Sequence, residues 1–307
     1  MIGSVRVKIP GDPTPLNRVA DRRAPRMARA LVAVFDRVRP SLTTITAAFQ
    51  ASPGTVQHVP DWSQFWTITK ADDDTFESVY QEIVQAAAKQ VPVFGGSLNL
   101  VEANAVQIAQ QRAGQLVYGI NADSQEAIRT VLSASLNGDY TPQETARLIR
   151  SVVGLDPRRA QAVVNYRDGL TMVQAGDMTP EAIMDQFTLS RRVGQSLSQD
   201  RIDSLVSQYA DRQLASRATT ISRTETMRAA QDGQNALWDQ AAQQGLFDPA
   251  TAQLVWVITD EACDDCQENE AASPIPYGSD WPSGDPPVHP NCRCDISLDP
   301  GSPADSM

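Results

Sequence analysis

The sequence predicts a mainly α-helical protein with an N-terminal helical domain and a small C-terminal α+β module. Three observations lead to this prediction. Helix-start signals and apolar residues at helical spacing recur as far as Gly245, a β-forming stretch follows at 254–259, and all four cysteines lie after residue 262. With 307 residues, of which 41% are hydrophobic, the chain is long enough for two domains that each bury a core.

Prolines at positions 10, 13, 15 and 25 predict an extended arm over residues 1–25. A helical domain is expected over 26–122, and its first helix should begin near Ala24 and stop at Pro40. Three consecutive aspartates, 72–74, indicate the start of a later helix, because carboxylates complement the positive end of the helix dipole. That helix should end near Gln90, and a further helix is expected over about 100–116.

Residues 123–215 are expected to form a bundle of short helices. Thr141-Pro142-Gln143-Glu144 has the pattern of a capping box with proline at the first helical position. Asp156-Pro157 and Thr179-Pro180-Glu181 repeat the signal, so three helices should begin within about 40 residues. Two longer helices are then expected at 198–216 and 217–244.

The C-terminal module is expected to span 216–299, followed by a tail at 300–307. Residues 254–259 are rich in β-formers and have the length of a strand, and 295–298 offer a second short strand. Between them, residues 273–291 contain six prolines and two glycines, a composition that excludes regular structure.

Two clusters of metal-ligand type flank that proline-rich segment. Cys263-Asp-Asp-Cys266 follows the first strand, and His289-Pro-Asn-Cys292-Arg-Cys294 precedes the second. Cysteines separated by two residues have the spacing of a structural zinc site. The two clusters contain five candidate ligands, one more than the four positions of a tetrahedral site. Either the four cysteines bind zinc with His289 behind them, or His289 replaces Cys292 or Cys294.

Other interpretations of the cysteines are disulfides or free thiols. A metal is favoured because the chain has no secretion signal and because a proline-rich loop without a core of its own needs a cross-link. A nucleic-acid-binding finger is disfavoured, since residues 260–299 contain ten acidic side chains and only one basic side chain, Arg293.

Catalysis is not expected. The only histidines are His58 and His289, the chain has no His-x-Glu of the kind that zinc deaminases use, and a zinc with four strong ligands has no open position for water. We therefore expect no enzymatic activity and no small-molecule substrate.

Charge and hydropathy suggest where partners bind. The net charge is −11, yet residues 1–40 hold nine basic and three acidic side chains. The arginines at 18, 22, 23, 26, 29, 37 and 39 are thus candidates to contact DNA or an acidic protein surface, although charge runs usually form a solvated helix face. No apolar run suggests a signal peptide or a membrane span, so we expect a soluble protein made in a cytoplasm.

The order of these features resembles the Mu F-like minor head protein family of bacteriophages. The resemblance is carried by Arg217 to Thr226, Ala229, Gly233 and Trp238, then Trp256, Asp260, Cys263-x-x-Cys266 and Pro287 to Cys294, and it covers about residues 125–298. It implies a virion protein of low copy number at the portal vertex that acts in head assembly. It also implies the portal protein or the major capsid protein as partner.

Two alternatives to that role remain open. The chain could be an internal protein ejected with the genome or, less favoured, a phage enzyme. For Arg223 and Glu225, two interpretations also stay open: pairing along the helix surface, for instance Glu225 with Arg228, or charged hydrogen bonds that fix the helix against the cysteine module.

Overall fold

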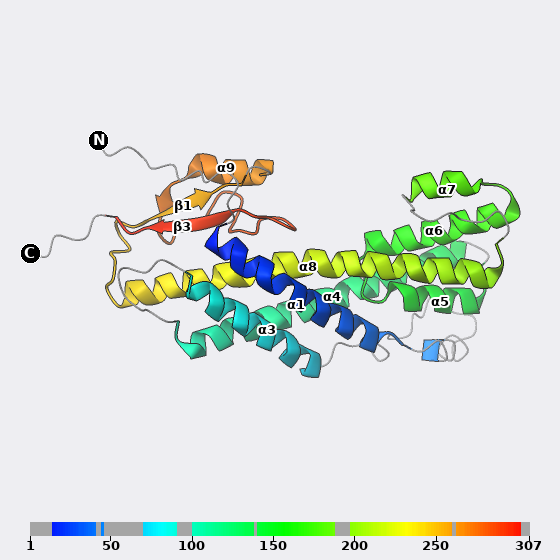
Figure 1. The fold of residues 1–307 in the computed structure, drawn as a ribbon, viewed down its shortest axis with the longest axis horizontal. Coiled ribbons are helices and arrows are strands. Elements are labelled where there is room, and N and C mark those ends of the chain that lie inside the picture. The colour runs from blue at the N-terminus through cyan, green and yellow to red at the C-terminus, as the bar shows by residue number, and fades with distance from the viewer. Residues whose placement is uncertain are drawn as a thin grey trace, which may run out of the picture. The chain divides into compact units, whose positions relative to one another are not determined.

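The computed structural model describes residues 14–40, 44–45, 70–90, 100–137, 140–187, 197–259 and 262–301. It is mainly helical, as the sequence predicts, and contains a small antiparallel three-stranded sheet (Figure 1). The chain divides into two compact units made of discontinuous segments. Unit 1 comprises 1–30, 73–114 and 219–307, and unit 2 comprises 31–72 and 115–218. Among the described helices, none has the length and apolar character that a bilayer crossing requires.

The helices and strands have the following bounds: α1 Pro15–Val38, α3 Lys70–Ala88, α4 Glu102–Asn137, α5 Pro142–Val152, α6 Pro157–Ala175, α7 Pro180–Gln186, α8 Gln199–Gln243, α9 Asp264–Ala272, β1 Gln253–Val257, β2 Ile275–Pro276 and β3 Asp295–Asp299. Four of these helices, α1, α3, α4 and α8, contribute residues to both units.

Helix α1 begins at Pro15, nine residues before the predicted start at Ala24, so the expectation of an extended arm is wrong for residues 15–25. The hydroxyl of Thr14 accepts a hydrogen bond from the amide of Asn17 at 3.1 Å, and Pro15 stands at the first helical position, where an amide hydrogen is not needed. Pro25 lies inside the helix at a cost of roughly 3 kcal/mol. Burial of Leu16, Val19 and Met27, each contributing about 1.5–3 kcal/mol, outweighs it.

Helices α4 and α8 are longer than predicted. The helix expected over 100–116 continues to Asn137, and the two helices expected over 198–216 and 217–244 are one helix. The predicted domain boundaries at 122/123 and 215/216 both fall inside these helices. Neither helix contains proline, and Gly233 of α8 serves close packing: a Cβ there would lie 2.5 Å from the carbonyl oxygen of Val84 in α3.

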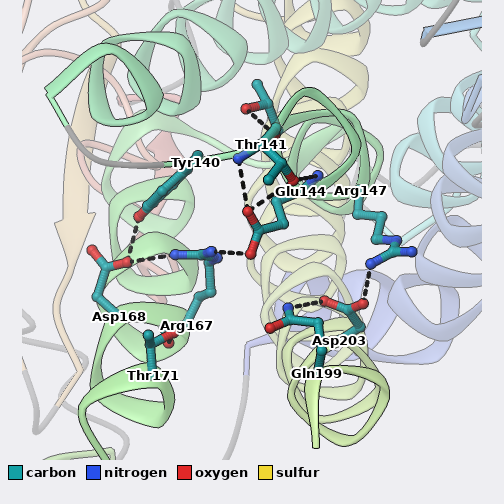
Figure 2. Close-up of polar contacts among 10 residues, drawn as sticks. Tyr140, Thr141, Glu144, Arg147, Arg167, Asp168, Thr171, Gln199 and Asp203 are labelled. Atoms are coloured by element: carbon teal, nitrogen blue, oxygen red, sulfur yellow. Dashed lines mark hydrogen bonds and ion pairs between the residues drawn. The ribbon is translucent and has the colours of Figure 1, made fainter. Parts of the chain in front are cut away.

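The three predicted helix starts in unit 2 are confirmed. Thr141 caps α5 in a complete capping box with Glu144, Asp156 caps α6, and Thr179 caps α7. Figure 2 shows that the Glu144 carboxylate also receives a hydrogen bond from Arg167 of α6 at 2.6 Å. The capping signal at α5 therefore also connects two helices of the bundle.

Both predicted strands exist and pair with each other in unit 1. The strand order is β2-β1-β3, all antiparallel, and Val257 at the end of β1 lies opposite Asp295 at the start of β3. The sheet packs on a core that includes Leu237 and Trp238 of α8 together with Trp256, Trp281 and Ile296. The segment 273–291 is irregular as expected, except that Ile275 and Pro276 form β2.

Candidate metal centre

The strand register explains how the two cysteine clusters meet. Because Val257 pairs with Asp295, the chain that leaves β1 and the chain that enters β3 lie at the same end of the sheet. The hydroxyl of Thr259, two residues beyond β1, lies 4.0 Å from the sulfur of Cys294. The sheet thus brings segments some 30 residues apart in the sequence to one place.

Helix α9 positions the first pair of cysteines. Cys263 is the N-cap of this helix and Cys266 lies in its first turn, so the two-residue spacing spans a helix N-terminus. No helix was predicted here. Free amide hydrogens at a helix N-terminus point outward and favour negative charge, which suits thiolate ligands. Cys263 makes no side-chain capping hydrogen bond, so capping does not engage its sulfur.

The five predicted ligands fall into two overlapping groups. Cys263, Cys266 and His289 form one group with ligand atoms within 4.8 Å of one another, and Cys266, Cys292 and Cys294 form a second. Cys266 belongs to both: its sulfur lies 3.6 Å from that of Cys292 and 3.7 Å from Nε2 of His289. Ligand atoms around a tetrahedral zinc with Zn–S bonds of about 2.3 Å are roughly 3.7 Å apart, so these spacings fit such an ion.

Burial separates the five ligands into two kinds. Cys266, Cys292 and Cys294 are buried, whereas Cys263 and His289 are half-buried. Nδ1 of His289 lies 3.0 Å from the carbonyl oxygen of Pro290, an arrangement that holds the ring with Nε2 toward Cys266. Both predicted ligand sets therefore stay open. All four cysteines are free thiols in this structure, with no disulfide between them.

The sulfur cluster distributes protons unevenly. Hydrogen bonds from Cys294 and Cys266 lower the pKa of Cys292 to about 5, while burial raises the pKa of Cys266 to about 12. The hydrogen bond to Cys292 likewise raises the pKa of Cys294. One thiolate is thus stabilised within the cluster, and ionising further thiols calls for a cation.

Helix α8 fixes the second cluster through contacts that the sequence analysis did not predict. The hydroxyl of Thr224 accepts a hydrogen bond from the amide of Asn291 at 3.1 Å, and Gln234 donates to the carbonyl of Ile296 at 2.7 Å. Glu225 instead forms an ion pair with Arg228 and accepts a hydrogen bond from Tyr80 of α3 at 2.8 Å. Of the two interpretations of Glu225, pairing along the helix is the one that the structure shows.

Helix α1 holds the same cluster from another side. The side-chain amide of Asn17 donates to the carbonyl of Arg293 at 2.9 Å, and the Arg293 guanidinium pairs with Asp21 at 2.7 Å. The charge of Arg293, the only cation within the cysteine cluster's sequence, is thereby directed to α1. The hydrogen bond between Asn17 and Arg293 joins residues more than 270 positions apart, so the local capping pattern at Thr14 could not predict it.

The proline-rich segment has more structure of its own than predicted. Trp281 is 3% exposed and packs edge-to-face on Trp256, with ring centroids 5.0 Å apart. Asn269 of α9 is fully buried, donates to the carbonyl of Gly284 at 3.0 Å and accepts from the amide of Ser283 at 2.9 Å. A metal would therefore add to these contacts, and it would not be the sole cross-link.

Two residues quoted in the sequence analysis, His58 and Asp260, lie outside the described residues. Comparison with protein-family models, with curated proteins and with solved structures found no match for this chain.

Proposed function

We propose that the cysteine cluster binds a structural zinc ion that fastens the sheet, α9 and the proline-rich segment to one another. The observation that carries the proposal is the convergence of four sulfurs and one imidazole from two separate stretches. Thiolate and imidazole are the ligands that zinc prefers, and four such ligands close the coordination sphere to water. This closure supports a structural rather than a catalytic role.

The metal content of purified protein tests this proposal. Wild type should contain about one zinc per chain. Cys266→Ser should lose it, because Cys266 is the ligand shared by both groups. Replacement of Cys263, Cys292, Cys294 and His289 one at a time then identifies the four ligands, since loss of a non-ligand leaves zinc in place.

His58→Gln is the matched control for His289→Gln, because His58 is the only other histidine. Zinc retained at full occupancy in Cys266→Ser, or no metal in wild type purified without chelator, would refute the zinc site.

We further propose that the protein is a bacteriophage minor head protein that acts at the portal vertex in head assembly. The support is the order along the chain of helix α8, strand β1 and the two cysteine clusters, which is the order that carries the resemblance. The contacts that Thr224 and Gln234 of α8 make to the second cluster add to it. The partner surface would be provided by the portal protein or the major capsid protein.

Imaging of virions with a label on this chain tests the assignment. A minor head protein should lie at the portal vertex and remain with the emptied head. Loss of the chain from emptied particles would instead indicate an ejected protein. Absence from virions, together with co-purification with neither portal nor capsid protein, would refute a virion role.

A further inference from the structure

A cavity of about 330 Å³ lies between the beginning of α1 and the end of α3, within unit 1. Its charged lining consists of four cations, Arg18, Arg22, Arg23 and Lys89, and one carboxylate, Glu82. Gln85 and Gln90 add amide groups that can donate hydrogen bonds. An excess of positive charge around a hollow is unusual in a chain whose net charge is −11.

The one carboxylate is already engaged. Glu82 forms an ion pair with Arg26, and its other oxygen lies 3.7 Å from Nε of Arg23. Asp21, the nearest acidic residue of α1, pairs with Arg293. Within the described part of the chain, Arg22 and Lys89 have no ion-pair partner, and the Nε of Arg23 is buried without a hydrogen bond.

Backbone charge and the flanking sequence do not cancel this excess. The positive end of α1 and the negative end of α3 meet at the cavity, so the two helix dipoles offset each other and the side chains decide the sign. Residues 91–99, which follow the cavity in sequence, contain no acidic residue, and residues 1–13 contain one acidic and two basic residues. The sequence on either side therefore supplies no surplus of carboxylates.

We infer that this cavity binds a phosphate group, held by Arg22 and Lys89. Guanidinium groups match the oxygens of phosphate in geometry, and lysine adds a point charge. A volume of about 330 Å³ is enough for a phosphate with part of what carries it, which includes the sugar of a nucleic-acid strand. The inference does not depend on the zinc site or on the head-protein role.

Binding of inorganic phosphate to the full-length chain, measured by calorimetry or by NMR titration, tests the inference. Arg22→Gln and Lys89→Gln should each weaken binding about tenfold, the effect of losing one charged hydrogen bond. Both side chains are exposed, so neither change should unfold the protein. Arg29→Gln is the matched control: Arg29 is also exposed on α1 and carries the same charge, but it lies outside the cavity.

The source of the phosphate is distinguished with a short single-stranded DNA oligonucleotide. Tighter binding than that of inorganic phosphate, lost in the same two variants, identifies a nucleic-acid strand as the ligand, whereas affinity no greater than for phosphate identifies a free phosphate. Failure of wild type to bind phosphate saturably, or equal weakening in all three variants, would overturn the inference, because it would show no site or only an effect of net charge.

Discussion

The cysteine cluster of unit 1 and the polar network around Arg167 in unit 2 (Figure 2) both gather side chains from separate helices or strands, but they differ in charge balance. In the network, Arg167 pairs with Glu144 and Asp168 and stacks on the ring of Tyr140 at 3.8 Å. Tyr140 in turn donates to Asp168, and burial with this bond raises its pKa to about 12. Each charged group there has an oppositely charged partner in the protein, because both carboxylates pair with the guanidinium of Arg167.

The cysteine cluster has no such balance. It offers five electron-pair donors, and the adjacent guanidinium of Arg293 is directed to Asp21. A group of metal-ligand atoms gains stability by binding a cation, whereas a network whose charges are already paired gains little from a ligand. The comparison thus separates a candidate site from a structural network by whether the protein itself supplies the counter-charge, and each prediction below tests one side of it.

The largest expected effect is that of metal removal. A zinc chelator should increase amide hydrogen exchange in residues 253–299 at least about a hundredfold, because metal binding and folding of such a module are coupled. Exchange in α5 and α6 should stay unchanged, since the Arg167 network needs no ion. Equal acceleration in both regions, or in neither, would contradict the distinction drawn between them.

The sequence predicted the local features of these two regions but not the contacts between distant residues. The caps at Thr141, Asp156 and Thr179 could be predicted because helix capping is local, and the cysteines could be predicted as candidate ligands because few other functions use that spacing. The contacts of Arg167 with Glu144 and of Thr224 with Asn291 join distant positions, so no local pattern reveals them. The predicted length of α1 was wrong for a related reason. Burial of its apolar residues in the tertiary structure stabilises α1 across Pro25, and a local sequence pattern does not show that burial.

The next effect in size is expected from Arg167→Met. Arg167 is 7% exposed, and its removal leaves Glu144 with little solvent and Asp168 without an ion-pair partner. Breaking a buried pair from one side costs more than the pair contributes, so unit 2 should lose about 2–3 kcal/mol of unfolding free energy. Denaturant unfolding, monitored by amide hydrogen exchange in α5 and α6, measures this loss of unfolding free energy. Arg129→Met is the control, because its ion pair with Glu126 is exposed and should contribute less than about 0.5 kcal/mol.

A smaller effect, dependent on pH, is expected from Glu144→Gln. Burial opposes ionisation of Glu144, but hydrogen bonds from Thr141 and Arg167 outweigh it, so its pKa is lowered in the folded protein. A carboxyl with a lowered pKa stabilises the fold above the pKa of the unfolded chain, near 4.3, and loses this contribution as the pH falls through the folded value. Wild type should therefore exceed the variant in stability by about 1–2 kcal/mol at pH 7. The difference should shrink below about pH 4 in stability curves, and a difference independent of pH would exclude a role for the charge.

The smallest effect, and the finest test of the network, is that of Thr141→Ala. Thr141 accepts from the amide of Glu144 at 3.3 Å and donates to its carboxylate at 2.8 Å, so its loss should cost α5 about 1 kcal/mol. Thr179→Ala is the matched control, since Thr179 caps α7 through the amide of Ala182 alone. In the Thr141 variant, Glu144 also loses a hydrogen bond that orients it toward Arg167, and exchange should therefore rise in α6 as well as in α5. If the disturbance stays within α5, as it should stay within α7 for the control, the cap and the Arg167 ion pair are energetically independent and the network is no more than neighbouring contacts.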